Sequence, residues 1–559
     1  MIQDKENDWF TEFKKGEEYK AFLKNPVAYF CAEYALESTL PTYAGGLGVL
    51  AGDLVREVAL QKFPLISVGL FYKKGQNILS TEKILPKNKL KPVLDESGKE
   101  VIVSLPMENR PVKVRAWQWE DGGARVYLLD TDIPENRAED RKITEQLYNE
   151  DRDMRLRQEI LLGIAGFRLL AQLGYHPSVY HLNEGHSAFL ALELIKHEME
   201  HQQVDFKEAC EYAKKHIVFT NHTLLMSGQE RFSSDKVKLF IDPCAKEICL
   251  NQNEIAELGT LENNPDTFSM TNFSFKLSTK SNAVSRLHQE KSIEIWPNKN
   301  IENVTNGIFI SRWDKVDGVS EKNIWATHLK NKKKLLDFIR EKTGEIWNET
   351  DLIFVWARRL VEYKQPLFFL DNIEKLLEIS KNSPIPIRIV FSGPITTEDN
   401  PFVLEIKKII KEKLKGIVVF IPDYNTDIAE ILTSGADIWL NTPMVGFEAC
   451  GTSGMKAGLN GVLALSTQDG WVYEVEEEDI GWVINDSQNS EEIFTLVKEK
   501  IIPIYYAHLK NLQNSMWLKK MMRARNLILE NFSTSRVLRE YIEKLYIPIM
   551  KQKHTHKID

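Results

Sequence analysis

The sequence has few cysteines, and their positions form no motif. They are scattered along 559 residues, at Cys31, Cys210, Cys244, Cys249 and Cys450. No Cys/His pair has the spacing of a zinc site, so we expect no metal. An odd, scattered set of this kind is typical of reduced thiols in a cytoplasmic protein.

The sequence also lacks a signal peptide, a membrane span and an excess of positive charge. The first twenty residues are highly charged and contain no apolar core of a signal peptide. No apolar run is long enough to cross a membrane. The formal net charge of −8 argues against a general nucleic-acid binder. If the substrate is anionic, its positive site must therefore be local.

What is present is typical of a large soluble protein built from strands and helices. Apolar residues make up 43% of the chain, and its length indicates more than one domain. Buried-strand patterns at residues 27–33, 216–223 and 385–394 end in polar or turn residues, and those at 177–200 and 351–379 continue into helices. This alternation predicts parallel sheets covered on both faces, with ligands beyond the carboxyl ends of the strands.

Residues 303–313, NVTNGIFISRW, separate two such α/β series. We therefore expect two doubly wound domains that face each other across a cleft. The predicted boundaries are 1–305 for the N-terminal domain and 306–530 for the C-terminal domain. Residues 531–559 are predicted to form a C-terminal helix and a polar tail.

Four polar clusters follow predicted strands. The glycines of GGLG, Gly45–Gly48, favour a plain turn when they are taken alone, and His222 in TNHT and His186 in LNEGHS favour structural roles. The cations of ARRLVEYK, within Arg358–Lys364, fit two interpretations equally well, a solvated helix start or an anion site. An anion site is supported because three such charges repel one another unless an anion lies between them.

The fourth cluster is EACGTSGMKAGLNG, residues 448–461, in which one lysine stands among small residues. A glycine-rich turn that leads into a helix exposes N–H groups that can hold a phosphate. We expect Lys456 near the start of that helix, where its charge opposes the helix dipole. This cost disappears if Lys456 is a neutral imine of an aldehyde whose phosphate takes the N–H groups, and pyridoxal phosphate is such an aldehyde.

This segment resembles the pyridoxal-phosphate segment of the α-glucan (glycogen or maltodextrin) phosphorylases. GGLG, LNEGH, TNHT, VTNGIFISRW and RRLVEYK are also similar to segments of that family, in the same order, over residues 27–475. The resemblance implies a GT-B architecture of two Rossmann-like domains with the active site in the cleft between them. It implies reversible phosphorolysis of the ends of α-1,4-glucans to glucose 1-phosphate, with retention of configuration, and a possible homodimer.

The resemblance also assigns roles to individual residues. The catalytic residues would be Arg359, Lys364, His222 and Lys456. The residues that hold pyridoxal 5′-phosphate would be Lys456, Gly451, Thr452, Arg358, Trp313 and Tyr424. Gly46 and Leu47 would hold the substrate phosphate through their backbone, together with Arg359 and Lys364. The hydroxyls of the reacting glucose would be bound by Asn306, His222, Glu448 and Tyr363.

The chain departs from the vertebrate pattern of the family at three positions. Arg358 replaces a lysine, Cys450 replaces a serine, and Asn425 replaces an arginine. Only about thirty residues precede the first matching strand, so the chain resembles a short microbial type and regulation by phosphorylation or nucleotide is not expected.

Two alternatives stay open on the sequence. One is a nucleotide-sugar glycosyltransferase of the glycogen-synthase type, which would share the fold and GGLG but has no need of Lys456. The other is an inactive glucan-binding relative.

Overall fold

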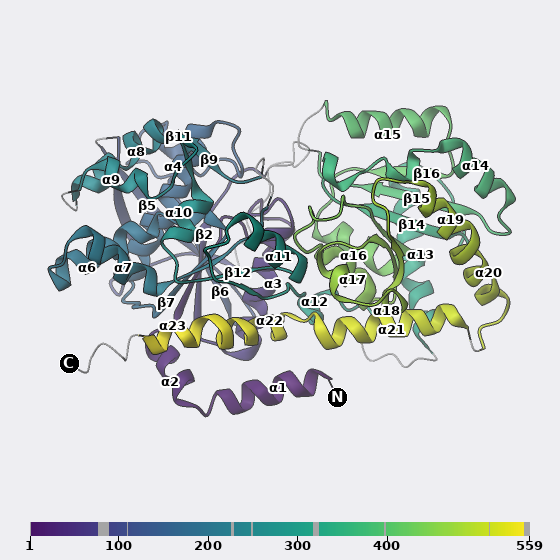
Figure 1. The fold of residues 1–559 in the computed structure, drawn as a ribbon, viewed down its shortest axis with the longest axis horizontal. Coiled ribbons are helices and arrows are strands. Elements are labelled where there is room, and N and C mark those ends of the chain that lie inside the picture. The colour runs from purple at the N-terminus through teal and green to yellow at the C-terminus, as the bar shows by residue number, and fades with distance from the viewer. Residues whose placement is uncertain are drawn as a thin grey trace.

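The structure is a computed structural model, and it describes residues 2–75, 89–108, 110–224, 228–247, 250–316, 323–395, 399–513 and 515–552. The described residues form two α/β halves side by side, and helices from both ends of the chain run beneath them (Figure 1). Cys249 and the polar tail after Gln552 lie outside the described residues. The four cysteines within them are free and buried.

The first half is built on a mixed sheet. Its strands lie in the order β13-β12-β8-β7-β1-β2-β6-β5-β3, with β4 also paired to β5. The strands are β1 (Val27–Phe30), β2 (Leu65–Leu70), β3 (Leu90–Pro92), β4 (Ile102–Met107), β5 (Arg110–Asp121), β6 (Ala124–Asp130), β7 (Val179–Asn183), β8 (Ile217–Thr220), β12 (Lys280–Ala283) and β13 (Ile301–Asn303). The run from β13 to β6 is parallel, and β5 pairs antiparallel with β6, β3 and β4.

A second, smaller sheet in this half is antiparallel and follows the order β10-β11-β9. Its strands are β9 (Arg231–Ser233), β10 (Thr260–Leu261) and β11 (Asn264–Ser269). The helices of the first half are α3 (Gly46–Gln61), α4 (Arg152–Ile160), α5 (Gly166–Gln172), α6 (Leu190–Gln202), α7 (Phe206–Ala213), α8 (Ser234–Glu247), α9 (Gln252–Glu257), α10 (Met270–Lys276) and α11 (Arg286–Ile295).

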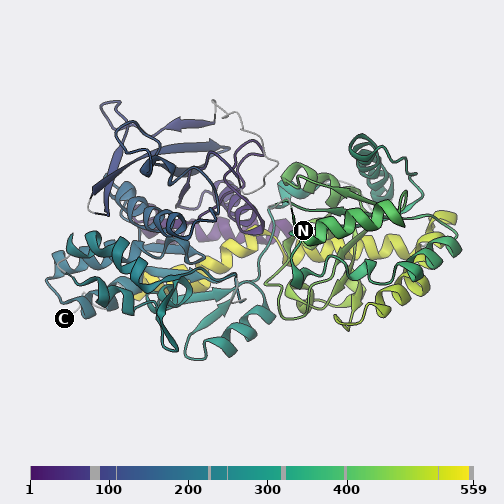
Figure 2. The same cartoon turned by 90° about the horizontal axis from the view of Figure 1, so that it is seen from above.

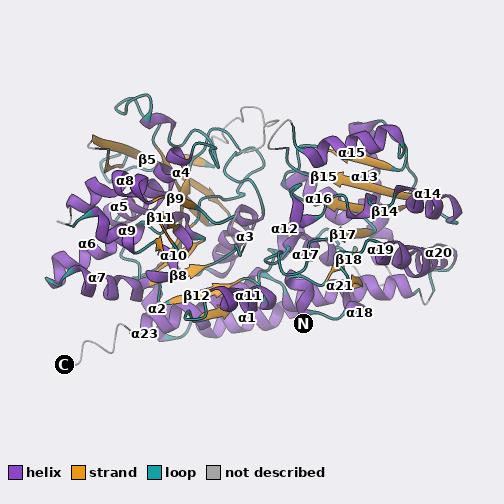
Figure 3. Cartoon of the chain, turned by 45° about the horizontal axis from the view of Figure 1, so that its top comes forward, coloured by secondary structure: helices purple, strands orange, loops and turns teal. Residues whose placement is uncertain are grey.

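The second half contains a wholly parallel sheet in the order β16-β15-β14-β17-β18-β19. Its strands are β14 (Leu352–Ala357), β15 (Ile387–Ser392), β16 (Val418–Ile421), β17 (Ile438–Asn441), β18 (Leu463–Thr467) and β19 (Gly481–Ile484). The helices around it are α12 (Ile310–Trp313), α13 (Ile324–Thr343), α14 (Ile373–Asn382), α15 (Pro401–Glu412), α16 (Thr426–Gly435), α17 (Thr452–Leu459), α18 (Glu477–Ile480), α19 (Glu491–Leu496) and α20 (Ile502–Lys510). Figure 3 shows strands with helices around them in both halves.

Both parallel runs have the strand order of a doubly wound fold. Numbered along the chain within each sheet, the strands of the second half lie in the order 3-2-1-4-5-6, and the parallel strands of the first half begin in the same way. The order reverses between β1 and β7 in the first half and between β14 and β17 in the second. The predicted α/β class with Rossmann-like, GT-B-type halves is confirmed. Ligands of such sheets bind where the order reverses.

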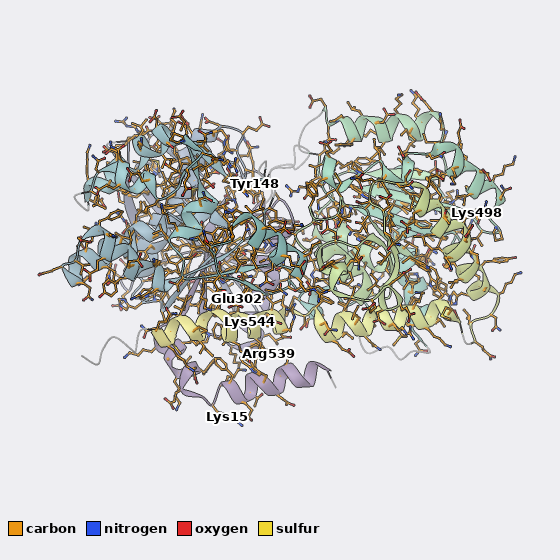
Figure 4. The ribbon with its side chains drawn as sticks, viewed as in Figure 1. Lys15, Tyr148, Glu302, Lys498, Arg539 and Lys544 are labelled. Carbon is orange, nitrogen blue, oxygen red and sulfur yellow. The ribbon has the colours of Figure 1, made fainter. Side chains whose placement is uncertain are left out.

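The ends of the chain join the two halves. Helix α21 (Met516–Asn531) packs in the core of the second half through Trp517 and Met521. Helices α22 (Thr534–Glu540) and α23 (Ile547–Gln552) pack against the first sheet together with α1 (Ile2–Phe13) and α2 (Glu17–Lys24), as Figure 2 also shows. Figure 4 labels Arg539 on the α22 side facing α1, where its guanidinium pairs with Glu6.

The chain passes between the two halves twice, and the two connecting segments lie side by side. The N–H of Ile308 donates to the Phe532 carbonyl at 2.9 Å, and the N–H of Thr534 donates back to the Ile308 carbonyl at 2.9 Å. A Cβ at Gly307 would stand 2.6 Å from the Ser533 carbonyl oxygen, so only glycine permits this approach. The domain boundaries at 305 and 530 stay predictions. No helix among the described residues is long and apolar enough to cross a membrane.

A buried charge network fixes α13 against the second sheet. Lys332 donates from its Nζ to Asp437 Oδ2 at 2.5 Å, and the same carboxylate accepts the Ile353 N–H at 2.8 Å. Neither Lys332 nor Asp437 is exposed to solvent. The network therefore ties the helix to β14 at the start of the strand.

Replacing Lys332 with methionine should destabilise the second half strongly. Asp437 would keep its burial and lose its cation, a change that costs about 3–5 kcal/mol. The measurement is denaturant unfolding followed by tryptophan fluorescence. Lys330→Met, on the exposed side of the same helix, is the control and should change stability by no more than about 0.5 kcal/mol. Equal effects of the two substitutions would contradict the prediction.

Candidate active site

The glycine segment that follows β1 forms the start of α3. Gly45 precedes the helix, and the carboxylate of Glu33 accepts the N–H groups of Ala44 at 2.7 Å and Gly45 at 3.1 Å. No other atoms lie within 4 Å of a Cβ placed at Gly45 or Gly46. The N-terminus of α3, with the backbone of Gly46 and Leu47, is therefore open to a ligand, and its first N–H groups have no acceptor within the helix.

Gly48 has a different reason to be glycine. A Cβ there would stand 2.6 Å from the Tyr43 Cβ and 2.8 Å from a Glu33 carboxylate oxygen. Tyr43 in turn reaches the second half, because its hydroxyl accepts the Thr426 N–H at 3.2 Å. The glycine segment is thus attached to the start of α16, directly after Tyr424 and Asn425.

Lys456 lies in α17, which follows β17 at the point where the strand order reverses. Gly451 precedes this helix with a left-handed backbone at φ 84°. The expectation that Lys456 stands at the helix start is wrong, because α17 ends at Leu459 and Lys456 lies in its last turn. A positive charge there is favoured by the helix dipole, so the cost inferred from the sequence does not arise.

Burial, rather than the helix dipole, changes the chemistry of Lys456. Its Nζ lies 4.0 Å from the centre of the Trp313 ring, and the residue is 6% exposed. Burial lowers the pKa of Lys456 to about 8, with a further decrease from Arg312 and an opposing increase from Asp53. Far more of this amine is therefore neutral near physiological pH than of an ordinary lysine, and the neutral amine is the form that reacts with a carbonyl.

Asp53 joins the first half to the residues around Lys456. This buried carboxylate on α3 accepts the Trp313 indole N–H at 2.7 Å and the Phe309 N–H at 3.2 Å. It also pairs with Arg312 at 3.2 Å. The ring against which Lys456 packs is thus positioned by the helix that carries the glycine segment.

The cations that follow β14 gather around a carboxylate from the loop after β17. Glu448 Oε2 accepts Lys364 Nζ at 2.7 Å and Arg358 Nη1 at 3.0 Å. Although burial raises the pKa of Glu448, these two cations hold it at about 2. Burial lowers the pKa of Lys364 to about 8. The anion that the cation cluster requires is therefore supplied in part by the protein.

Arg359 and Tyr363 belong to the same segment, and no hydrogen bond joins them to Glu448 among the described residues. Arg359 is exposed, and its guanidinium lies beside the Tyr363 hydroxyl. Tyr363 is partly buried, and its carbonyl accepts the Met444 N–H at 2.8 Å, which ties the loop after β14 to the loop after β17. Gly451 faces Glu448, since a Cβ at Gly451 would stand 3.5 Å from the Glu448 Cγ.

Asn306 lies beside the lysine segment. Its N–H donates to the Val284 carbonyl at 3.0 Å, and its Oδ1 is buried with no hydrogen-bond partner among the described residues. His222 lies at the end of β8 in the first half. Its Nε2 lies 2.7 Å from Asn183 Oδ1, and burial lowers its pKa to about 3, so the ring is neutral.

The sequence did not single out three carboxylates that shape these loops. Asp469 accepts the N–H groups of Phe447 at 3.1 Å and Glu448 at 2.8 Å, and Glu184 accepts the His222 N–H at 2.9 Å. The third is Asp53. Asp469 and Glu184 come just after strands, as the predicted site residues do. A search for polar residues after predicted strands could therefore have found them. Asp53 lies inside a helix and carries no such signal.

The sequence profile of the carbohydrate phosphorylase family matches residues 131–317 and 314–554. The chain is 33% identical to the maltodextrin phosphorylase of Thermococcus litoralis over 97% of this chain and 72% of that protein. It is 30% identical to the glycogen phosphorylase of Aquifex aeolicus, over 97% of this chain and 89% of that protein. An uncharacterised protein of Methanocaldococcus jannaschii is 30% identical over 93% of this chain and 99% of its own length. The fold and the matched residues define a GT-B-type phosphorylase, and the chain belongs to the carbohydrate phosphorylase family.

Replacing Asp53 with asparagine should lower the pKa of Lys456 below about 8, because it removes the carboxylate that raises it. More of the amine is then neutral near neutral pH. We expect faster reductive methylation of Lys456 in the cofactor-free variant than in cofactor-free wild type, measured by peptide mapping against pH.

The matched control is Glu57→Gln on the same helix. Glu57 is also buried, but it hydrogen-bonds to Gln61 and Thr534 instead. This variant should leave the pH profile of Lys456 unchanged. A profile that is identical in wild type and Asp53→Asn would show that Asp53 does not act on the lysine.

Proposed function

We propose that this protein is a pyridoxal-phosphate-dependent α-glucan phosphorylase. It transfers the terminal glucose of an α-1,4-glucan to inorganic phosphate and releases glucose 1-phosphate with retained configuration. The proposal rests on a cluster of residues at the point where the strand order of the second sheet reverses. There a buried, partly neutral Lys456 lies near a group of cations, and Asp53 joins this cluster to the open N-terminus of α3. A glycosyltransferase of the synthase type would need no such lysine.

The residues around Lys456 fit the cofactor. The amine is buried against a flat indole, one turn after the left-handed Gly451 and the start of α17 at Thr452. We assign the cofactor phosphate to the N–H groups of Gly451 and Thr452 and to Arg358, and the ring to Trp313 and Tyr424. When bound, the cofactor supplies a second phosphate that can exchange a proton with the substrate phosphate.

The substrate phosphate is assigned to Arg359, Lys364 and the N-terminus of α3 at Gly46 and Leu47. Arg359 is exposed and offers a planar pair of donors to an oxyanion. Lys364 is held by Glu448 and is already positioned at the site. Two phosphates at close range require surrounding cations, which gives Arg358, Arg359 and Lys364 a common purpose.

The reacting glucose is assigned to Asn306, His222, Glu448 and Tyr363. The buried Oδ1 of Asn306 has no hydrogen-bond partner among the described residues, so it can accept a sugar hydroxyl without losing another bond. The neutral ring of His222 makes one hydrogen bond through Nε2 and leaves Nδ1 for a hydroxyl. A site that hydrogen-bonds a hydroxyl rejects analogues that lack it, because its own polar groups stay unpaired.

The departures from the vertebrate pattern have local explanations. Arg358 keeps a positive charge beside Glu448. Cys450 is buried and packs in a hydrophobic cluster with Trp313 and Met455. Asn425 caps α16 by accepting the Ile428 N–H at 2.9 Å. A cytoplasmic location, predicted from the few scattered cysteines, and a homodimer, implied by the resemblance, remain predictions.

The function is tested with purified protein, inorganic phosphate and a series of maltodextrins. We expect glucose 1-phosphate release and an imine absorbance of one chromophore per chain. Borohydride reduction and peptide mapping should mark the peptide that contains Lys456. In Lys456→Arg both the absorbance and the release should be lost, because a guanidinium forms no imine with the cofactor.

Lys315→Arg is the control, since Lys315 is bound to Glu430 and to the Arg312 carbonyl outside the assigned site. It should retain the chromophore and most of the activity. A chromophore on another lysine would refute the assignment of Lys456. Phosphate-independent transfer from a nucleotide sugar would replace the proposed reaction with the synthase type.

A further inference from the structure

Three metal-binding side chains converge in the first half, outside the site assigned above. They are Glu159 at the end of α4, His186 in the short turn after β7, and Glu230 directly before β9. One ligand atom of each lies within 4.8 Å of the others. Tyr148, labelled in Figure 4, lies beside this group, with its ring centre 6.1 Å from that of His186. The spacing of these residues along the chain gives no motif, which is why the sequence indicated no metal.

Several polar atoms of this group lack hydrogen bonds. Both carboxylate oxygens of Glu159 and the Nδ1 of His186 are buried and have no hydrogen-bond partner among the described residues. Glu159 is 2% exposed and His186 is 6% exposed. A buried carboxylate without donors is costly, so Glu159 needs either a proton or a cation.

The surrounding charges leave an excess of negative charge. Arg155 Nη2 lies 2.6 Å from Glu230 Oε1 and 3.6 Å from Glu159 Oε1. Arg152 Nη1 lies 2.9 Å from Glu230 Oε2, but its side chain is 54% exposed and its charge is screened by solvent. The carboxylate of Glu184 is a third acid nearby. Arg155, which is buried, therefore faces two carboxylates, and Glu184 adds to their negative charge.

We propose that Glu159, His186 and Glu230 bind a divalent transition-metal ion such as Zn²⁺ or Mn²⁺. One imidazole and two carboxylates suit such ions, and three protein ligands leave a position for water. Ligand atoms at about 2.0–2.2 Å from an ion stand roughly 3–3.5 Å apart, so side-chain rotation within 4.8 Å brings them into place. Arg155 then holds Glu230 in place from outside the ligand set, as hydrogen-bond partners of metal ligands do.

The ion has a structural role in this proposal. It joins α4, the end of β7 and the segment before β9, which are far apart in the chain. The neighbouring Glu184 holds the backbone of His222, so the same turn supports the assigned glucose site. The proposal does not depend on the proposed reaction, because it rests on residues to which that reaction gives no role.

The test is zinc binding by the whole, cofactor-loaded protein after chelation and dialysis. A second candidate site must first be removed, because the rings of His197 and His201, one turn apart on α6 and exposed, lie 4.3 Å from each other. Titration calorimetry with Zn²⁺ and separately with Mn²⁺ is therefore done in the double variant His197→Ala/His201→Ala. We expect one ion per chain and a higher unfolding temperature with the ion than without it.

Glu159→Gln in that background should abolish the binding step while preserving the unfolding temperature of the chelated protein, because the amide has nearly the same shape. Should this variant fail to fold, Co²⁺ absorption of the parent and its loss in His186→Gln give the answer. No ion bound by the double variant, or undiminished binding in Glu159→Gln or His186→Gln, would overturn the proposal and leave Glu159 as a protonated acid.

Discussion

The carboxylate of Asp53 is the contact on which the arrangement of the site depends. Asp53 lies on α3 in the first half, and its carboxylate accepts hydrogen bonds from the Trp313 indole and the Phe309 backbone at the start of the second half. The same helix begins at the open glycine segment, and the same indole covers Lys456. The buried carboxylate of Asp53 therefore positions the start of α3, where we propose that phosphate binds, relative to Lys456, the proposed cofactor lysine.

Charge is distributed in the site so that anions can enter. Arg358 and Lys364 are buried and are paired with Glu448, while Arg359 stays exposed. Burying these two cations beside a carboxylate costs less free energy than burying them unpaired would. The overall charge of the chain is negative, with a formal net charge of −8. The phosphate site proposed at the ends of β14 and β17 and the start of α3 would therefore be a local positive site.

The sequence predicted the sheets well because buried parallel strands are continuous apolar runs that end in polar residues. It also singled out Lys456, Lys364 and Glu448 as candidate site residues, because their segments follow such strands. It could not show that Glu448 would occupy the space between Arg358 and Lys364, since that contact joins loops ninety residues apart. It misplaced Lys456 within α17 because the helix is unusually short. Asp53, Glu159 and Glu230 were missed because their partners come from distant segments and follow no spacing.

The most direct test of this account is a double-mutant cycle between Asp53→Asn and Trp313→Phe, with kcat/KM for phosphate in phosphorolysis as the measured quantity. Because the two side chains share one hydrogen bond that positions the site, their effects should not add. We expect a coupling energy of about 0.5–3 kcal/mol, as for residues in direct contact. Additive effects within about 0.3 kcal/mol would contradict the claim that Asp53 positions the site through Trp313.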